Sequence, residues 1–473
     1  MEKIKKMLVY FNTENLLYLF VIICPILDIL SFLFRKYTGL TISPTTIIRP
    51  IIPTVVFIIL FFKEKNKKSK IIVGLIYFIY SIIHLIIFES LRNESSYGNL
   101  KNELQYIINY SFLIINLYLF KHKFKDENKL KNVVFIVLTI YILSIIISIV
   151  TKTSYTTYLE GIGYKGWFES ANSICTTLLL AVLIILPDLN IKNIGRIFII
   201  AITGGYLIFL SGMRTGLIGF CLVIAVFILG KIFIALKDKI KISKKKIIIV
   251  TMLIAVSIIG VLYGGSQTIE RRKELKEFEI NNIDEETGKK RYVSVEILNV
   301  YKKIQAGELE ADYMTESEKA AIKDLCEFAE KHNKSNVDLR TQQLIYNIYF
   351  VKEQKNISYI LFGNGYKNQT GELVMEMEVP AFLCNFGIIG FILYFGPFLA
   401  IFIYSLYKGI KNIKYITLDY IMYLAGAGLA IALSTLSGYV YFIFSSMLLT
   451  IIINVLLLEK AKNIKPIGEV VNK

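Results

Sequence analysis

The stretch Leu361–Phe391, LFGNGYKNQTGELVMEMEVPAFLCNFGIIGF, joins two unlike parts of this chain. In it a glycine-rich turn leads to two carboxylates, Glu376 and Glu378, at the start of a new apolar run. The preceding residues, 265–379, are long and charged, with 17 Lys and Arg against 21 Asp and Glu. Most of the remaining chain consists of apolar runs. We therefore expect a soluble segment that a membrane bundle holds over a site at the lipid–water boundary.

The composition places most of the chain in a membrane. Of its 473 residues, 55% are hydrophobic, and the mean hydropathy is +0.56, whereas soluble domains are about 45–50% apolar. A helix needs roughly 20 apolar residues to cross the hydrocarbon layer. We predict an all-α polytopic membrane protein that divides into 1–264, 265–379 and 380–473. The twelve predicted spans are 14–34, 44–62, 71–89, 103–120, 132–150, 171–187, 194–211, 215–236, 246–264, 380–407, 416–435 and 438–458.

The positive charge sets an orientation for these spans. The net charge is +17, but 37 of the 54 Lys and Arg residues lie outside 265–379, largely between spans. With both termini cytoplasmic, the inner connections hold 28 Lys and Arg and the short outer ones seven, the bias that cytoplasmic loops carry. The large segment is then extracytoplasmic, and no nucleic-acid partner is expected. The five cysteines show no paired spacing, so neither a zinc site nor a disulfide framework is indicated.

A few polar residues fall inside or beside the predicted spans. Asp28 lies within the first span, and Arg49 near the start of the second, followed by a proline that loosens the helix. Ionisable groups at this depth usually face a polar cavity, although a residue near a helix end can also reach the interface. Trp167, the only tryptophan, is either an interfacial aromatic anchor or a ligand contact. Asn172 can bind a polar ligand or another helix.

Two arginines mark candidate anion sites. Arg214 follows a tight turn at the start of the eighth span, where guanidinium donors and free backbone N–H groups meet. In the large segment, Thr315–Glu318 has the sequence of a capping box, and Asp338 is suited to cap a second helix with Arg340 in its first turn. Residues 271–301 are expected to be helical, with a solvated turn around Asp284.

Three stretches resemble one family. GWFESANSICTTLLLAVLIILP (166–187) looks like a G-x-F-x-x-x-N helix entry, and SGMRTGLIGF (211–220) is similar to an S-x-S-R-T/G arginine turn. The stretch DLRTQQLIYNIYFVKEQKNISYILFGNGY (338–366), followed by MEMEVPAFLCNFGIIGF (375–391), resembles the end of that family's large outer loop. By these motifs and the span layout, the chain resembles the bacterial O-antigen polymerase and O-antigen ligase superfamily.

This resemblance implies a metal-independent glycosyltransferase of the cytoplasmic membrane without a cofactor. Arg214 and Arg340 would neutralise the diphosphate of a polyprenyl-diphosphate-linked donor, and Glu376 would be the catalytic base. Glu378, Asn172, Arg49 and Trp167 are candidate substrate-binding residues. Many ligases of the family have a histidine where this chain has Glu376, and the E-x-E form looks more like polymerases of Gram-positive envelopes.

The resemblance also sets the expected partners and leaves alternatives open. The partners would be the lipid-linked donor and acceptor glycans and membrane lipid, together with a flippase and a chain-length regulator. A polymerase of oligosaccharide repeat units, such as those of a capsule, is the first expectation. A ligase that moves a finished glycan to another acceptor is the alternative, followed by a lipid-linked glycan transporter and by a sensor or scaffold built on the loop.

Overall fold

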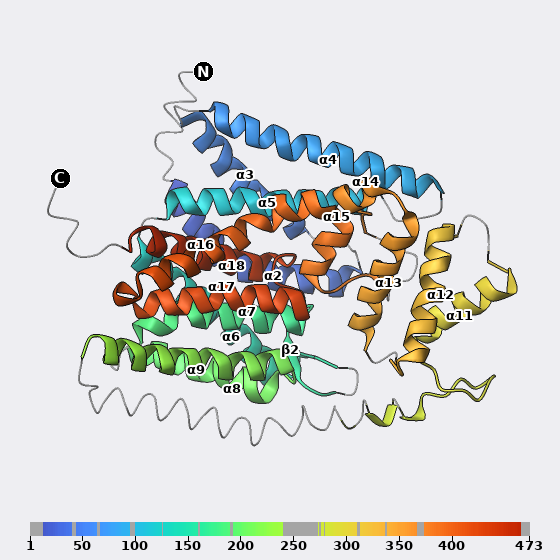
Figure 1. The fold of residues 1–473 in the computed structure, drawn as a ribbon. Helices are drawn as coiled ribbons and strands as arrows, with labels where there is room; N and C mark the ends of the chain where they lie inside the picture. Colours follow the sequence, from blue (N-terminus) through green and yellow to red (C-terminus); the bar gives the residue numbers. More distant parts are fainter. Residues whose placement is uncertain are drawn as a thin grey trace.

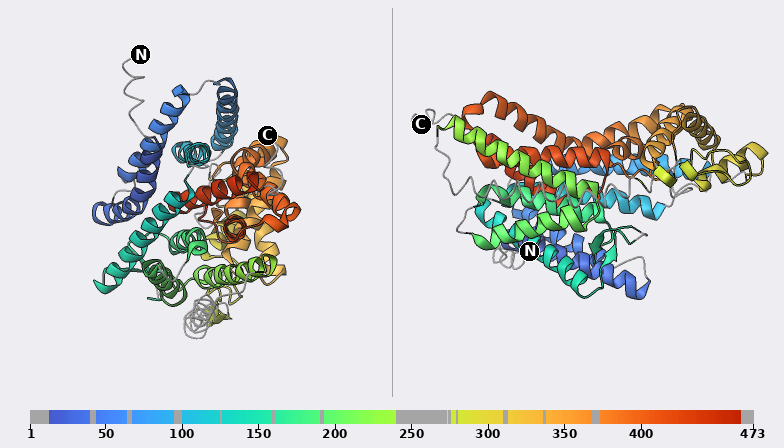
Figure 2. Two further views of the ribbon diagram at one scale, coloured as in Figure 1. Left: turned by 90° about the vertical axis from the view of Figure 1, so that its left-hand side faces the viewer. Right: turned by 90° about the horizontal axis from the view of Figure 1, so that it is seen from below.

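The computed structural model describes residues 13–39, 44–63, 67–94, 100–124, 126–158, 161–189, 193–239, 273, 276–278, 280–309, 313–335, 338–366 and 373–464. In these residues the chain is mostly helical, and its long helices lie side by side in one bundle (Figure 1). The helices of the large predicted loop gather at one end of that bundle, and the right-hand view in Figure 2 shows the same separation from below.

The helices agree in position with the predicted spans. The first part of the bundle contains α2 (Thr13–Thr38), α3 (Pro44–Lys63), α4 (Lys68–Glu94), α5 (Leu100–Lys123), α6 (Glu127–Val150), α7 (Ala171–Ile185), α8 (Ile194–Gly205) and α9 (Arg214–Lys237). The last part contains α15 (Glu378–Tyr394), α16 (Gly396–Lys411), α17 (Leu418–Leu436) and α18 (Phe444–Lys462). The ninth predicted span, 246–264, lies outside the described residues.

Fewer helices than twelve meet the length and apolarity needed to cross a membrane. Among the described residues seven do so, namely α2, α4, α6, α7 with the short turn that follows it, α9, α17 and α18. An eighth span results if α15 and α16, which are bent by 49° at their junction, are counted as one. The chain is therefore an all-α polytopic membrane protein with seven or eight such helices in its described part.

The centre of the bundle is formed by α7 and α18. In α7 nearly every residue is buried, and α18 is buried along most of its length. A helix that is apolar all round is stable only when other helices surround it, and α7 and α18 contact each other as well as α17. By contrast, α4 exposes a broad apolar face, as expected for a helix in contact with lipid.

Ion pairs join the helices at the end of the bundle opposite the loop. The buried ammonium of Lys131 on α6 lies 2.8 Å from Asp188 and 2.7 Å from Asp419. On α18, Lys460 lies 2.8 Å from Glu127 at the start of α6. Buried charges are tolerated when they are paired in this way. The start of α6, the start of α17 and the end of α18 therefore meet at one end.

The large loop has its own small core, made by α11 (Val295–Ala306), α12 (Glu316–Lys331) and α13 (Leu339–Gln354). Thr315 and Glu318 form the predicted capping box. Asp338 stands at the N-cap of α13 as predicted, but its side chain makes no capping hydrogen bond. The solvated turn expected around Asp284 is present, whereas the helix expected over the rest of 271–301 is absent from residues 282–294. There Asp284 accepts hydrogen bonds from Thr287, and a turn brings Ile283 to pair with Lys290.

A short hairpin, not predicted from the sequence, connects α6 and α7. Its strands β1 (Tyr155–Thr156) and β2 (Tyr164–Gly166) pair antiparallel. The hairpin packs closely against the turn before α9. At Gly163 the approach is so close that a side chain would collide with the backbone oxygen of Ser211. This contact fixes the start of α9 beside the start of α7.

The glycine-rich turn of the opening stretch fits into a break in α15. At Gly387 the backbone has φ 67° and ψ −177°, which interrupts the helix. The backbone N–H groups of Asn364 and Gly365 donate to the oxygens of Cys384 and Asn385 at 3.0 and 2.9 Å. The hydroxyl of Tyr80 on α4 donates to the oxygen of Phe386 at 2.6 Å. The turn after α14 (Ile357–Phe362) therefore supplies donors to carbonyls around the break.

A buried histidine on α4 holds the same turn from the other side. The ring of His84 contacts the oxygen of Phe362 through Nδ1 and the carboxyl of Glu103 through Nε2, both at 2.7 Å. Because a carbonyl oxygen only accepts, Nδ1 carries a proton. The second oxygen of Glu103 accepts the N–H of Tyr366 at 2.9 Å. No spacing in the sequence connects His84 with its partner on α5.

Glu378 anchors the turn between α17 and α18. Its side chain is buried, and its oxygens accept the N–H groups of Val440, Tyr441 and Phe442 at 2.7–3.0 Å. Successive backbone N–H groups of this kind form an anion-binding concavity. Residues 438–443 therefore take their position from a carboxylate two residues after Glu376.

We predict that Gly387→Ala destabilises the protein by about 1–3 kcal/mol, because this backbone region is almost reserved for glycine. The added Cβ would also collide with the backbone of Leu361 and Gly363. Gly74→Ala is the matched control, since Gly74 is helical and nothing lies within 4 Å of its added Cβ. Thermal unfolding of the purified proteins in detergent should place only the Gly387 variant well below wild type. Equal melting temperatures would contradict the docking described above.

Replacing Glu378 by alanine should cost roughly 2–4 kcal/mol of stability, because it leaves buried backbone donors without an acceptor. Glu378→Gln keeps one oxygen and should lose less. The control is Glu286→Ala, which removes a carboxylate whose side chain is 80% exposed and should change stability by less than about 1 kcal/mol. The measurement is the melting temperature of each variant, and a Glu378→Ala protein as stable as the control would refute the anchoring role.

Candidate functional site

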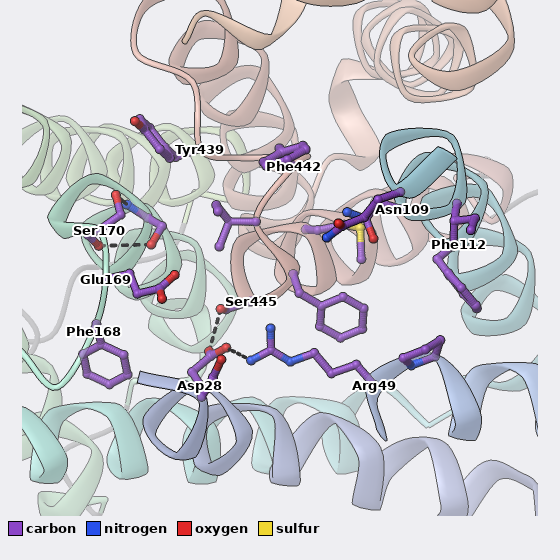
Figure 3. A pocket seen from close by; sticks show the side chains of 18 of the residues that line it. Asp28, Arg49, Asn109, Phe112, Phe168, Glu169, Ser170, Tyr439, Phe442 and Ser445 are labelled. Carbon is purple, nitrogen blue, oxygen red and sulfur yellow. Dashed lines mark hydrogen bonds and ion pairs between the residues drawn. The ribbon is translucent and has the colours of Figure 1, made fainter. Parts of the chain in front are cut away.

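A cavity of about 980 Å³ opens in the half of the bundle next to the loop. Figure 3 shows side chains from α2, α3 and α5, from the segment that begins α7, and from the turn before α18 around it. Its charged lining residues come from α2, α3, the start of α5 and the residue before Ser170. They are Asp28, Arg35, Arg49, Lys101 and Glu169. The volume is at the upper end of the range of small-molecule sites.

One side of the cavity holds an ion pair that the sequence did not connect. Arg49 on α3 donates to Asp28 on α2, and its guanidinium lies 5.6 Å from the ring centre of Phe444. Asp28 also accepts the hydroxyls of Tyr141 and Ser445, both at 2.6 Å. In the described part of the chain, Nε of Arg49 has no hydrogen-bond partner. Asp28 therefore holds the guanidinium of Arg49 in place, and the Nε–H donor of Arg49 remains available.

Arg340 and Glu376, predicted to act together, are in contact. Nε of Arg340 donates to Oε2 of Glu376 at 3.2 Å, and both side chains are about one-third exposed, at 39% and 34%. The backbone N–H of Glu376 donates to Oε1 of Gln343, one turn along α13. Within the described residues, Oε1 of Glu376 makes no hydrogen bond, so this oxygen is available to accept a proton.

Tyr439 connects this pair to the cavity that it lines. Burial raises the pKa of the Tyr439 hydroxyl, the Glu376 carboxylate raises it further, and the Arg340 guanidinium lowers it. The neighbouring Gly438 lies so close that a side chain there would collide with the backbone oxygen of Glu376. Glu376 and Arg340 thus lie beside the edge of the cavity, on the side formed by residues 438–443.

Glu378 and Trp167, which were predicted to bind substrate, both have hydrogen-bond partners within the protein. The carboxylate of Glu378 is occupied by the backbone N–H groups of residues 440–442, so its setting is that of a positioning residue. The indole N–H of Trp167 donates to the hydroxyl of Thr153 at 3.0 Å. Trp167 does not line the cavity, although its neighbour Phe168 does.

Arg214 and Asn172 lie together but apart from the cavity lining. Arg214 is exposed and is the first residue of α9. Next to it, the hydroxyl of Thr215 approaches Oδ1 of Asn172 at 3.5 Å, at the long limit for a hydrogen bond. In the described structure no hydrogen bond or ion pair joins Arg214 or Asn172 to Arg340 or Glu376. The predicted two-arginine clamp is therefore not assembled by direct contacts.

Sequence reasoning passed over several polar residues that line the cavity. Gln105 and Asn109 lie one helical turn apart on α5, and Arg35 pairs with Glu169, another lining residue, at 2.5 Å. Gln105 and Asn109 could have been found from their spacing, because polar residues four apart in an apolar helix lie on one face. Among the described residues, no group of three or more His, Cys, Asp or Glu side chains could hold a metal ion.

Comparison with known proteins gives one family. No protein of curated function matches the chain. The sequence model of a family described as O-antigen ligase like membrane protein matches residues 11–463, nearly the whole length. The chain therefore belongs to this O-antigen ligase-like family of membrane proteins, which act in the transfer of glycans.

Proposed function

We propose that this protein polymerises oligosaccharide repeat units carried on a polyprenyl diphosphate, at the outer face of the cytoplasmic membrane. Its large loop is then extracytoplasmic. Membership of the family supports glycan transfer in general. The observation that carries the proposal is the contact of Arg340 with Glu376 beside a cavity of about 980 Å³, which puts a carboxylate and a guanidinium next to a space for substrate.

The reaction needs a base and a stabilised leaving group. Oε1 of Glu376 takes the proton of an acceptor hydroxyl, whose oxygen then attacks the anomeric carbon of the donor sugar. The bond from that carbon to the phosphate oxygen breaks, and the lipid diphosphate leaves with its negative charge. A guanidinium suits this charge because its donors match phosphate oxygens in pairs. The base must reach the acceptor hydroxyl, and a cation must reach the phosphate oxygens of the leaving group.

Arg340 is the cation nearest to the base, and two further arginines extend the positive field. Arg49 lies within the same cavity, held against Asp28. Arg214 is exposed at the start of α9, where backbone N–H groups add to its charge. We assign diphosphate binding to Arg49 inside the cavity and to Arg340 beside its edge, with Arg214 as a further contact on the outer surface. Glu378 positions the turn that carries Tyr439.

The alternative is transfer of a finished glycan to a different kind of acceptor, and the family's description as ligase-like is what favours it. The two reactions share the same donor chemistry and the same base. They differ in the acceptor, which carries a lipid diphosphate only in the polymerase. Analysis of the product with purified components separates them, because a polymerase lengthens the lipid-linked chain itself.

Glu376→Gln should lower the rate of transfer from lipid-linked repeat units by about 100-fold or more, the usual contribution of a positioned base. The variant should fold normally, since Gln keeps the shape of the side chain. The assay is chain elongation by purified protein, and the control is Glu330→Gln on the exposed face of α12. Wild-type elongation by the Glu376 variant would remove Glu376 from the mechanism.

Arg340→Ala should reduce elongation by a similar factor of about 100, and Arg340→Lys should restore little of it, because an ammonium cannot offer paired donors. Arg214→Ala should weaken donor binding while leaving the melting temperature unchanged, since Arg214 has no partner among the described residues. Lys331→Ala, which removes a loop cation at the end of α12, is the control for both. Full activity of Arg340→Ala and Arg214→Ala would overturn the assignment of these cations.

A further inference from the structure

One face of α5 is polar where it borders the cavity. Lys101, Gln105 and Asn109 follow one another at intervals of four residues, and all three line the cavity. In a helix this spacing puts them in one row. Polar side chains within a membrane bundle are costly and are usually tied to a function or to a polar cavity.

The two amides in this row have no structural task that the described residues reveal. Neither Gln105 nor Asn109 makes a hydrogen bond to the described part of the chain. Other amides in the bundle are engaged by their own helix, as Asn116 is with the oxygen of Phe112 at 2.9 Å. In Figure 3, Asn109 lies at the side of the cavity opposite Ser170. Its donors and acceptor are therefore open to whatever fills the space.

Hydroxyl groups at the start of α7 also line the cavity. Ser170, Ser173 and Thr177 line the cavity at helical spacing. The hydroxyl hydrogens of Ser173 and Thr177 are used within the helix, donating to the oxygens of Ser170 and Ser173 at 3.0 and 2.7 Å. Their oxygens can still accept. The cavity thus offers amides that donate and accept on one wall and mainly acceptors on the other.

The rest of the lining narrows the class of ligand. Phe112, Phe168 and Phe442 add flat apolar surface. A diphosphate needs cations rather than uncharged amides, so Gln105 and Asn109 do not suit it, whereas the cations Arg35, Arg49 and Lys101 line other parts of the cavity. A sugar has hydroxyl groups that both donate and accept, and it also has apolar C–H faces that pack on aromatic rings. Both features match the walls formed by α5 and α7.

We propose that Gln105 and Asn109 form a subsite for the sugar that follows the lipid diphosphate, and that they set which glycan the protein accepts. The subsite rests on the proposed function, because it places the diphosphate at Arg49 in the same cavity. The amides bind sugar hydroxyls directly, opposite the hydroxyl row of α7. They are binding residues and take no part in bond making or breaking.

The test compares two lipids on the full-length protein in lipid nanodiscs. One is undecaprenyl diphosphate, and the other is the lipid-linked oligosaccharide extracted from the membranes of the source cells. The variants are Asn109→Leu and Gln105→Leu, which remove each amide at similar size. The control is Asn102→Leu, an amide on the same helix that does not line the cavity. Melting temperatures establish that each variant is folded, and Asn109→Ala replaces Asn109→Leu if the latter is not.

Wild type should bind the glycosylated lipid more tightly than undecaprenyl diphosphate. Each cavity variant should bind the glycosylated lipid about three- to tenfold more weakly, the usual worth of one or two hydrogen bonds, and undecaprenyl diphosphate as wild type does. Unchanged binding of the glycosylated lipid, or equal weakening for both lipids, would overturn the subsite. Equal affinity of wild type for both lipids would overturn it as well but leave diphosphate binding intact. Binding of neither lipid would reject the proposed function itself.

Discussion

A membrane helix that breaks within a bundle needs partners for its backbone, because lipid supplies none. In α15 the break at Gly387 is met by the turn at Asn364 and Gly365, whose N–H groups donate to carbonyls of the broken helix. Tyr80 contributes a further donor from α4. The position of the loop's end is therefore set by backbone pairing and not by side-chain packing alone. This pairing fixes where the chain enters α15, and hence where the residues just before it can lie.

Two carboxylates that are separated by one residue have different settings as a result. Glu378, at the first turn of α15, is buried and holds three backbone N–H groups of residues 440–442. Glu376 lies outside the helix, partly exposed, with a single ion pair. The first carboxylate fixes the wall that carries Tyr439, and the second lies beside that wall. Glu378 is the first residue of α15, whereas Glu376 belongs to the segment before it, so different parts of the backbone position the two side chains.

The helices could be predicted from the sequence because their signals are local. Apolar runs located the helices to within a few residues, and Thr315–Glu318 gave the start of α12 through a four-residue pattern. The contact of Arg340 with Glu376 was anticipated only through the resemblance to a family. The pairing of Asp28 with Arg49, the partner of His84 and the occupation of Glu378 all join different helices. Such contacts depend on how helices pack, and a single sequence does not encode that in any local spacing. The hairpin at 155–166 was missed because strands of two and three residues are too short for an alternating pattern.

The arrangement around Asp28 explains how the cavity can hold a stable ion pair and still let Arg49 bind another anion. A lone arginine at this depth would be costly, and its ion pair with Asp28 lowers that cost. Asp28, however, also accepts the hydroxyls of Tyr141 and Ser445. If an anion takes over the donors of Arg49, the carboxylate keeps two hydrogen bonds and is not left bare, and leaving a buried charge bare is the main penalty when such a pair is broken. The guanidinium also remains beside the ring of Phe444, which favours a cation in its present position. The cavity can therefore exchange one anionic partner of Arg49 for another at modest cost, as the proposed binding and release of a lipid diphosphate requires.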